Sequence, residues 1–220
     1  MMLVFYFTRA EHALSNVRLR RVKISNLENL NDPFEWAAPA LEHAEDRWAL
    51  KATRTEMSKT TGMICFSENW RNPVQWAHYA DHHRGVCMGL EVQDSMLTKV
   101  KYRQERSPGG NLGEMLEEVR LDHKWMIDVI STKFAHWSYE EEHRAFLKLD
   151  PATIENGLYF KSFGDDMRLV QLIAGPKSRV TRQEFADALG PMASEVRCMK
   201  ARLAFKTYEV CEQQNARLWK

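Results

Sequence analysis

The sequence predicts an α+β fold built on a mixed or antiparallel sheet. β-rich and helix-compatible segments follow one another irregularly along the 220 residues, and no Gly-rich phosphate loop is present. A Rossmann or P-loop fold would require regular alternation of strands and helices together with such a loop. No internal repeat or coiled-coil heptad is visible. The irregular order therefore favours α+β.

The first half of the chain supplies strands at 3–8, 21–25, 62–67 and 86–92, with further β pattern at 99–102. A short helix is expected at 11–18. Asn-Asp-Pro at 31–33 places Pro33 at the first position of a helix that runs through 36–60. A third helix begins at Asn72-Pro73 and ends near Gly85.

The second half opens with the loop Ser107-Pro108-Gly109-Gly110 and continues as a long helical region over 112–134. Further strands are expected at 157–160, 169–173 and 196–203. A helix over 181–189 begins with a Thr-Arg-Gln-Glu capping box.

Composition indicates an ordered globular protein, with 44% hydrophobic residues and seven tryptophans. Its length fits a single domain over residues 1–220. A net charge of +1 gives no global case for nucleic-acid binding. The apolar runs are too short to span a bilayer, and the first residues lack the features of a signal peptide. A cytoplasmic protein without membrane contact is expected.

Four scattered cysteines suit a reducing compartment: Cys65, Cys87, Cys198 and Cys211. They form no C-x-x-C pair, and His82 and His83 lack carboxylates at a ligand spacing. No metal site is therefore predicted.

The most informative stretch is the predicted strand 140–147. Alternation places Glu140, Glu142, Arg144 and Phe146 on one face. Two carboxylates on one face raise each other's pKa, while Arg144 lowers both. This environment suits a catalytic acid or an anchor for a ligand hydroxyl. A solvated edge strand with a structural Glu–Arg pair is the alternative.

Polar residues elsewhere offer candidate pocket contacts. Asn31, Asp32 and Glu35 could line a pocket beside the glutamates, although helix capping also explains Asn31 and Asp32. Ser67 ends a strand and offers a hydroxyl for a ligand or an ST-turn. It does not stand in a G-x-S-x-G elbow, which excludes an α/β-hydrolase nucleophile.

The predicted helix at 73–85 carries aromatic residues and a histidine. Trp76 and Tyr79 lie one helical turn apart and face the same way. They could form a platform for a ligand or pack in the hydrophobic core. His78 could act as a general acid or base, or form a structural hydrogen bond. Lys133 could bind an anion, or cover a solvated helix end.

Taken together, these motifs resemble a bacterial family catalogued as domain of unknown function 2971. The resemblance spans most of the chain. It rests on Phe-Tyr-Phe-Thr at 5–8, Asn-Asp-Pro-Phe-Glu at 31–35, Cys-Phe-Ser at 65–67, Trp-Ala-His-Tyr-Ala at 76–80, the glycine- and cysteine-containing residues 83–89, the motif at 137–144, and the Ala-Gly-Pro turn ending at 176.

A more distant resemblance links the chain to the ADP-ribosyltransferase superfamily. It implies a mixed split β-sheet flanked by helices, which holds NAD between an early strand, a middle strand and a late glutamate. Glu142 would be the catalytic carboxylate, oriented by Glu140 or Arg144, and would stabilise an oxocarbenium-like transition state. Tyr6 stands where many of these enzymes have His or Arg, which points to altered or lost use of NAD.

The resemblance also implies the remaining contacts and partners. Thr8, Ser67 and Tyr79 would line the NAD pocket, with Trp76 beside them and 31–35 at its rim. The acceptor would be a protein or a nucleic acid. Two alternatives are a non-catalytic protein-interaction module with a degenerate site, and a hydrolase or nuclease that uses His78 with the glutamates.

Overall fold

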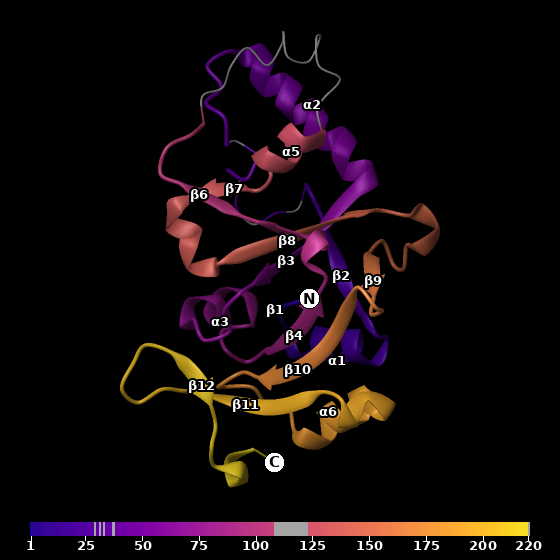
Figure 1. The fold of residues 1–220 in the computed structure, drawn as a ribbon, viewed down its shortest axis with the longest axis vertical. Coiled ribbons are helices and arrows are strands. Elements are labelled where there is room, and N and C mark those ends of the chain that lie inside the picture. Colours follow the sequence, from indigo (N-terminus) through magenta and orange to yellow (C-terminus); the bar gives the residue numbers. More distant parts are fainter. Residues whose placement is uncertain (29, 31, 33, 37, 108–122, 220) are drawn as a thin grey trace.

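The computed structural model describes residues 1–28, 30, 32, 34–36, 38–107 and 123–219. Within these ranges, ten strands form one large, mixed and strongly curled sheet (Figure 1). The strands are β1 (Met2–Thr8), β2 (Arg21–Asn26), β3 (Thr61–Ser67), β4 (Val86–Val92), β5 (Leu97–Lys99), β8 (Glu142–Lys148), β9 (Tyr159–Ser162), β10 (Met167–Ala174), β11 (Arg197–Leu203) and β12 (Val210–Glu212).

The main path of the sheet runs β12-β11-β10-β4-β1-β3-β2-β9, and β8 joins β3 on one side and β5 on the other. β10 and β11 are parallel and are connected through helix α6 (Arg182–Leu189), whereas the other pairs in the sheet are antiparallel. A separate parallel pair is formed by β6 (Lys101–Arg103) and β7 (Thr132–Phe134). The α+β class with a mixed sheet is thereby confirmed.

Helices cover the sheet in two groups, which lie in the upper and the lower half of the molecule in Figure 1. The helices of the first group are α2 (Ala44–Thr60) and α5 (His123–Val129), and those of the second are α1 (Ala10–Arg18) and α6. Helix α3 (Pro73–Tyr79) lies beside the middle of the sheet. The short 3-10 helices are η1 (Asp94–Met96), η2 (Ala135–Glu140), η3 (Pro151–Thr153), η4 (Gly190–Ser194) and η5 (Ala216–Leu218).

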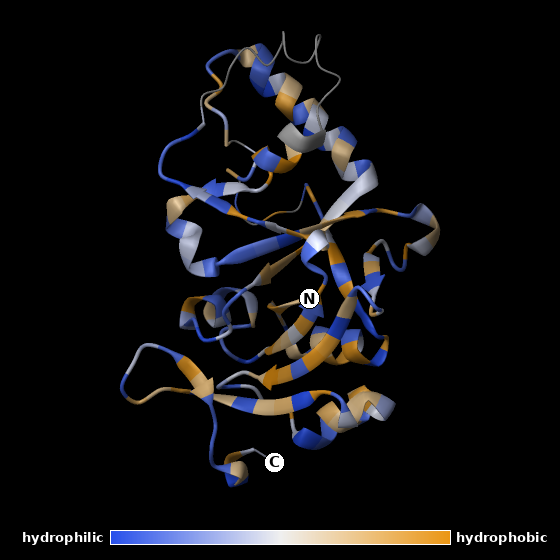
Figure 2. Ribbon diagram, in the orientation of Figure 1, coloured by the Kyte–Doolittle hydropathy of each residue, from blue (hydrophilic) through white to orange (hydrophobic). Residues whose placement is uncertain are grey.

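Buried hydrophobic side chains in the described part of the chain form three clusters. The largest joins the sheet to α1 and α6 through residues such as Val17, Met88 and Phe185. A second lies under α3 around Trp76, and a third lies under α2 and α5 around Met63. Figure 2 shows the corresponding hydrophobic positions along the inner strands, interrupted by hydrophilic ones as the pleat alternates.

Most predicted strands are confirmed within two residues, and so is the capping box of α6. Thr181 Oγ1 accepts from the Glu184 backbone N–H at 3.1 Å, while Glu184 Oε2 accepts from the Thr181 N–H at 2.8 Å. The helix expected to run from Asn72 to Gly85 ends earlier, at Tyr79. Three residues with positive φ, at 81–83, turn the chain there.

Three further boundary predictions were wrong. The helix expected over 36–60 begins at Ala44, because Trp36 lies in a turn and Pro39 forms a β-bridge with Ser107. The helix expected over 112–134 has residues 112–122 outside the described ranges. The prediction of a helix at its C-terminal end is wrong, because residues 132–134 form strand β7, which pairs with β6.

The third wrong boundary concerns the glutamate strand, which begins at Glu142. Glu140 ends the 3-10 helix η2, and Glu141 adopts a left-handed conformation with φ of 45°. β12 was not predicted. Of the described helices, none is long and apolar enough to cross a membrane.

Candidate active site

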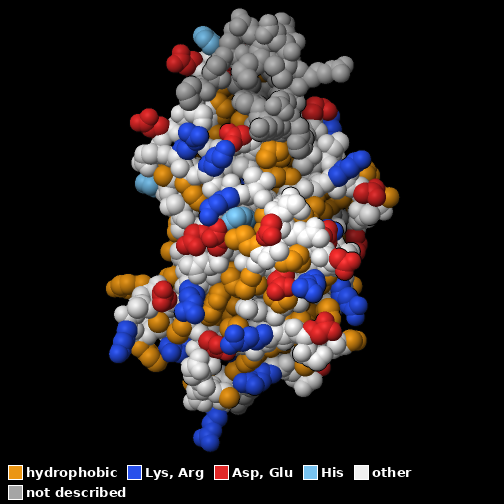
Figure 3. All heavy atoms as spheres, in the orientation of Figure 1, with side chains coloured by type: hydrophobic (Ala, Val, Ile, Leu, Met, Phe, Trp, Pro, Cys, Tyr) orange, Lys and Arg blue, Asp and Glu red, His pale blue; other side chains and the backbone are white. Residues whose placement is uncertain are grey.

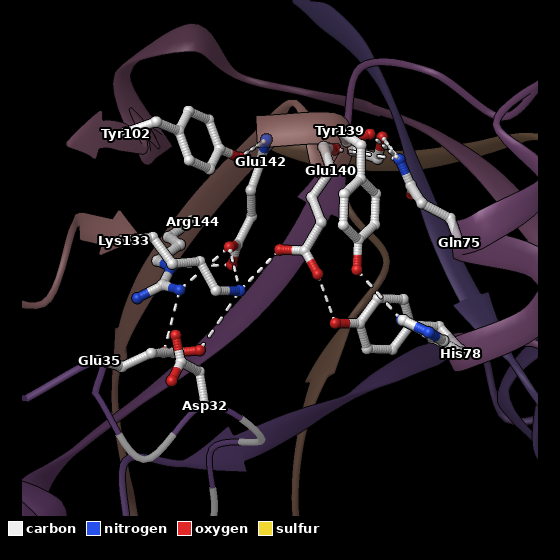
Figure 4. Close-up of polar contacts among 12 residues, drawn as sticks. Asp32, Glu35, Gln75, His78, Tyr102, Lys133, Tyr139, Glu140, Glu142 and Arg144 are labelled. Atoms are coloured by element: carbon white, nitrogen blue, oxygen red, sulfur yellow. Dashed lines mark hydrogen bonds and ion pairs between the residues drawn. The ribbon is translucent and has the colours of Figure 1, made fainter. Parts of the chain in front are cut away.

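Five charged side chains converge in the interior, from four different elements (Figure 4). Glu142 and Arg144 come from β8, Lys133 from β7, Glu140 from the end of η2, and Glu35 from the loop before α2. Each side chain is less than a tenth exposed. Burying charged groups is costly unless they are paired, so this cluster depends on its internal contacts.

The Lys133 ammonium group lies at the centre of the cluster and contacts all three of its carboxylates. Its Nζ lies 2.6 Å from Glu140 Oε2, 3.1 Å from Glu142 Oε2 and 3.4 Å from Glu35 Oε1. Three carboxylates thus share one ammonium group. Burial lowers the pKa of Lys133, but the three carboxylates outweigh it and raise the pKa above its ordinary value. Lys133 is therefore permanently charged.

Arg144 binds Glu142 through a fork of two hydrogen bonds. Its Nε lies 2.8 Å from Oε1 and its Nη2 lies 3.0 Å from Oε2. Nη2 is also 3.0 Å from Glu35 Oε2, as a charge contact without hydrogen-bond alignment. Nη1 donates to the Ile130 carbonyl. The solvated edge-strand interpretation of β8 is wrong, because Arg144 is fully buried and β8 has neighbours on both sides.

The two adjacent glutamates have opposite pKa shifts. Burial would raise the pKa of Glu142, but Arg144 and Lys133 outweigh it and lower the pKa to about 2. For Glu140, burial raises the pKa above its usual 4.5 and the charge of Glu142 raises it further, although Lys133 opposes both. Glu142 is thus a fixed anion, and Glu140 is the carboxylate that titrates nearer neutrality.

Helix α3 positions Glu140 from the opposite side. The Tyr79 hydroxyl donates to Glu140 Oε1. Gln75 Nε2 donates to Ser67 Oγ at 2.9 Å, to the Tyr139 carbonyl at 3.1 Å and to the Glu140 carbonyl at 3.2 Å. One amide therefore ties the end of η2 to the end of β3 and holds the Glu140 backbone in place.

A pocket of about 210 Å³ opens against this cluster. Glu35, Glu140, Glu142 and Lys133 form its charged wall. The remaining lining residues are aromatic, apolar or small polar ones: Phe5, Tyr6, Phe7, Ser25, Leu30, Cys65, Phe66, Ser67, Gln75 and Tyr79.

The pocket lies where the sheet is least tightly paired. The register between β1 and β3 contains one pair, Phe5 with Ser67. The neighbouring registers, β1 with β4 and β3 with β8, contain seven pairs each. Because the β1–β3 ladder is so short, side chains of both strands can border a cavity between them.

Six of the predicted site residues border this pocket: Tyr6, Glu35, Ser67, Tyr79, Glu140 and Glu142. Burial raises the pKa of Tyr6 to about 12, with the neighbouring Cys65 as a second cause, so its hydroxyl stays neutral. Arg144 lies behind the pocket wall, where it holds Glu142.

The other predicted residues lie elsewhere. Trp76 is fully buried in the cluster under α3, and Thr8 is buried at the end of β1; neither is among the residues that line the pocket. His78 is exposed outside the pocket, with Nδ1 3.1 Å from the Tyr139 hydroxyl (Figure 4).

The predicted rim is described only in part. Asp32 is buried beside Glu35, and its Oδ1 accepts from the Phe34 backbone N–H at 2.9 Å, a local turn contact of the capping kind. Asn31 lies outside the described residues.

The contacts of Gln75 and Tyr102 in this site were not predicted from the sequence. Gln75 stands four residues before Tyr79 on α3, and this spacing places both on one helix face, a signal that the sequence did contain. The Tyr102 hydroxyl accepts from the Glu142 backbone N–H at 2.8 Å. No local pattern marks Tyr102, because the contact spans forty residues.

Metal ligation has no support in the described part of the chain. No group of three or more His, Cys, Asp or Glu side chains there is placed to hold a metal ion. The four cysteines are free thiols.

Comparisons with protein-family models, with curated proteins and with solved structures gave no match.

Proposed function

We propose that the pocket binds the nicotinamide-ribose end of NAD and that Glu142 stabilises positive charge as the glycosidic bond to nicotinamide breaks. The observation that carries this proposal is a pocket wall in which the carboxylates of Glu140 and Glu142 share the buried ammonium group of Lys133, with pKa shifts in opposite directions. Pairs of carboxyl groups whose environments separate their pKa values are typical of sites that use one as a fixed charge and the other for proton transfer.

Glu142 has the chemistry of a fixed anion. A carboxylate offers about four lone-pair sites, and Arg144 and Lys133 occupy three of those of Glu142. The fourth can accept a ribose hydroxyl, in competition with the weak thiol donor of Cys65. With its pKa near 2, Glu142 stays ionised while an oxocarbenium-like charge develops at the ribose carbon.

Glu140 fits the role of proton acceptor. The bond between the ribose carbon and the nicotinamide nitrogen breaks, and nicotinamide leaves with the electron pair. An acceptor nucleophile then forms a bond to that carbon and gives its proton to Glu140. A carboxylate with a raised pKa is a stronger base for this step than an ordinary one.

The size and the lining of the pocket support binding of one end of a dinucleotide. A volume of about 210 Å³ is below the ~300–1,000 Å³ of sites that enclose a drug-sized ligand. It suits a single ring and its sugar, with the remainder outside. The cluster contains three carboxylates and two cations, so its net charge is negative. A negative site beside aromatic walls favours a positively charged ring such as the oxidised nicotinamide.

The interrupted ladder between β1 and β3 is compatible with the split sheet that an ADP-ribosyltransferase-like fold implies. Membership of the domain of unknown function 2971 family, and a more distant relation to the ADP-ribosyltransferases, remain part of this proposal. The acceptor would be a protein or a nucleic acid.

A second candidate is a non-catalytic interaction module that keeps the cluster for stability. The nearly complete internal pairing of Glu142, and Tyr6 at a position where the resemblance implies His or Arg, favour it. A hydrolase or nuclease using His78 is less well supported, because His78 lies outside the pocket.

Titration calorimetry with NAD, together with chromatographic detection of released nicotinamide, tests the proposal. Glu142→Gln should weaken binding and abolish release, whereas Glu141→Gln, the same change on the exposed neighbour, should leave both intact. A folded Glu142→Gln protein that retains full NAD cleavage would exclude this mechanism.

A second variant tests the proposal independently if Glu142→Gln does not fold. Ser25→Leu fills the pocket without removing an ion pair, and it should block NAD binding in a folded protein. Absence of heat and of a thermal shift at millimolar NAD in the wild type would assign the site to the interaction module.

A further inference from the structure

The loop between β11 and β12 projects from the molecule with two bare aromatic rings. Phe205 is 91% exposed and Tyr208 is 99% exposed. The base of the loop is fixed, because the Ala204 N–H donates to the Glu209 carbonyl at 2.9 Å and the Val210 N–H to the Arg71 carbonyl at 2.8 Å. A fixed base presents the rings in a defined place, which limits the entropy lost when a partner binds.

The loop borders a groove of about 530 Å³, larger than the pocket at Glu142. Its lining combines rings, cations and one carboxylate, among them His83, Lys177, Phe205, Lys206, Tyr208 and Glu209. A volume within the ~300–1,000 Å³ range is sufficient for a nucleotide-sized ligand.

Positive charge is interleaved with these rings. Of the cations on β11 and the loop, Arg197 pairs with Glu212 at 2.8 Å and Lys200 donates to the Ser178 carbonyl, which leaves Arg202 and Lys206 beside the rings. The Arg202 guanidinium lies 4.6 Å from the centre of the Phe205 ring. Figure 3 shows hydrophobic and basic side chains together on this projecting edge.

Lysines supply the charge of the groove. Burial and the neighbouring Lys177 lower the pKa of His83, so the imidazole is neutral at neutral pH. Lys177 and Lys206 are exposed, whereas Glu209 accepts a hydrogen bond from Thr207 at 3.1 Å. The balance favours an anionic ligand with flat, stackable groups.

We infer that this loop and groove bind single-stranded nucleic acid, with bases stacked on Phe205 and Tyr208 and phosphates held by Lys177, Lys206 and Arg202. Sites of this kind combine a cationic groove with exposed rings and tolerate many sequences. A purely apolar protein contact would not need cations between its rings. The inference does not depend on the use of NAD.

Fluorescence polarisation with a labelled oligothymidylate of about 12 nucleotides, without NAD, tests this inference. The wild type should bind, and the double variant Phe205→Ala/Tyr208→Ala should bind at least about tenfold more weakly. Lys177→Ala/Lys206→Ala should reduce the slope of log affinity against log salt by roughly 1.4, because two phosphate contacts are lost.

The matched control is Trp48→Ala/Lys51→Ala, an exposed aromatic residue and an exposed lysine on α2, and it should bind like the wild type. No binding at about 50 mM salt, or equal loss in the control, overturns the inference. Equally tight binding of a duplex also overturns it, because the bases of a duplex stack on one another and are not free to stack on Phe205 and Tyr208. Sedimentation that detects a dimer lost in Phe205→Ala/Tyr208→Ala, without oligonucleotide binding, would assign the surface to a second copy of the chain.

Discussion

Lys133 and Glu140 form an ion pair of 2.6 Å in which each side chain is about 95% shielded from solvent. The pair closes the charged wall of the pocket, since the same ammonium group also contacts Glu142 and Glu35. Breaking a buried pair by removing one partner costs far more than removing both, because the remaining charge is left without compensation.

Replacing Lys133 with methionine should therefore destabilise the protein by about 3–5 kcal/mol. Urea unfolding followed by fluorescence measures the change. Lys99→Met is the control: Lys99 pairs with Glu68 at 2.8 Å but is mostly exposed, so a loss within about 1 kcal/mol is expected. Similar losses in the two variants would contradict the buried ion-pair account.

Stability should fall as the pH falls through the acid range. The pKa of Glu142 is lowered in the folded protein from its usual 4.5 to about 2. Its contribution is present above 4.5 and is lost as the pH falls toward 2, because the unfolded state then binds the proton more readily. The contribution is on the order of 3 kcal/mol.

Unfolding free energies at about pH 7 and about pH 3 measure the part of this contribution that is lost above the folded pKa. The difference between the two should be smaller in Glu142→Gln than in the wild type. The raised pKa of Glu140 acts in the opposite direction: its contribution is present below 4.5 and is lost as the pH rises through the folded pKa. An unchanged difference in Glu142→Gln would exclude Glu142 as a source of acid sensitivity.

Tyr79→Phe should raise the pKa of Glu140 further, since the Tyr79 hydroxyl donates to that carboxylate and lowers its pKa. A stability loss of about 1–2 kcal/mol is expected. Carbon-detected NMR titration of the Glu140 carboxyl group reports the pKa directly. Tyr139→Phe removes a hydroxyl that contacts His78 instead and should leave the Glu140 titration in place.

Gly85→Ala should destabilise the fold by about 3 kcal/mol or more, because the added Cβ would lie 2.2 Å from the Thr8 carbonyl oxygen and 2.9 Å from the Ala80 backbone. Backbone atoms cannot move aside as a flexible side chain can. At Gly164 the nearest atom, Asp166 Oδ1, is 3.6 Å away, so Gly164→Ala should change stability by less than about 0.5 kcal/mol. Thermal unfolding of both variants makes the comparison.

The sequence predicted the elements whose determinants are local. Residues 86–92 carry the apolar run of a buried strand, and Thr181 with Glu184 forms a reciprocal cap. Alternation along β8 correctly placed Glu142 and Arg144 together. Glu140 also joins them, although it belongs to η2 and not to the strand, because Lys133 binds both glutamates.

The parts that the sequence did not predict depend on distant partners. Lys133 was expected at a helix end, but its strand exists through pairing with Lys101–Arg103, about thirty residues earlier in the chain. Trp76 and Tyr79 share a helix, yet Trp76 enters the core while Tyr79 reaches Glu140. Spacing alone could not assign them to different surroundings.

The single pair between β1 and β3 has a consequence for how the molecule unfolds. Backbone hydrogen bonding is extensive within β10-β4-β1 and within β3-β8, but scarce between these two groups. Each group can then open as a separate cooperative unit. A ligand in the pocket would touch both groups, so occupancy would convert two local openings into one global event and slow hydrogen exchange in both at once.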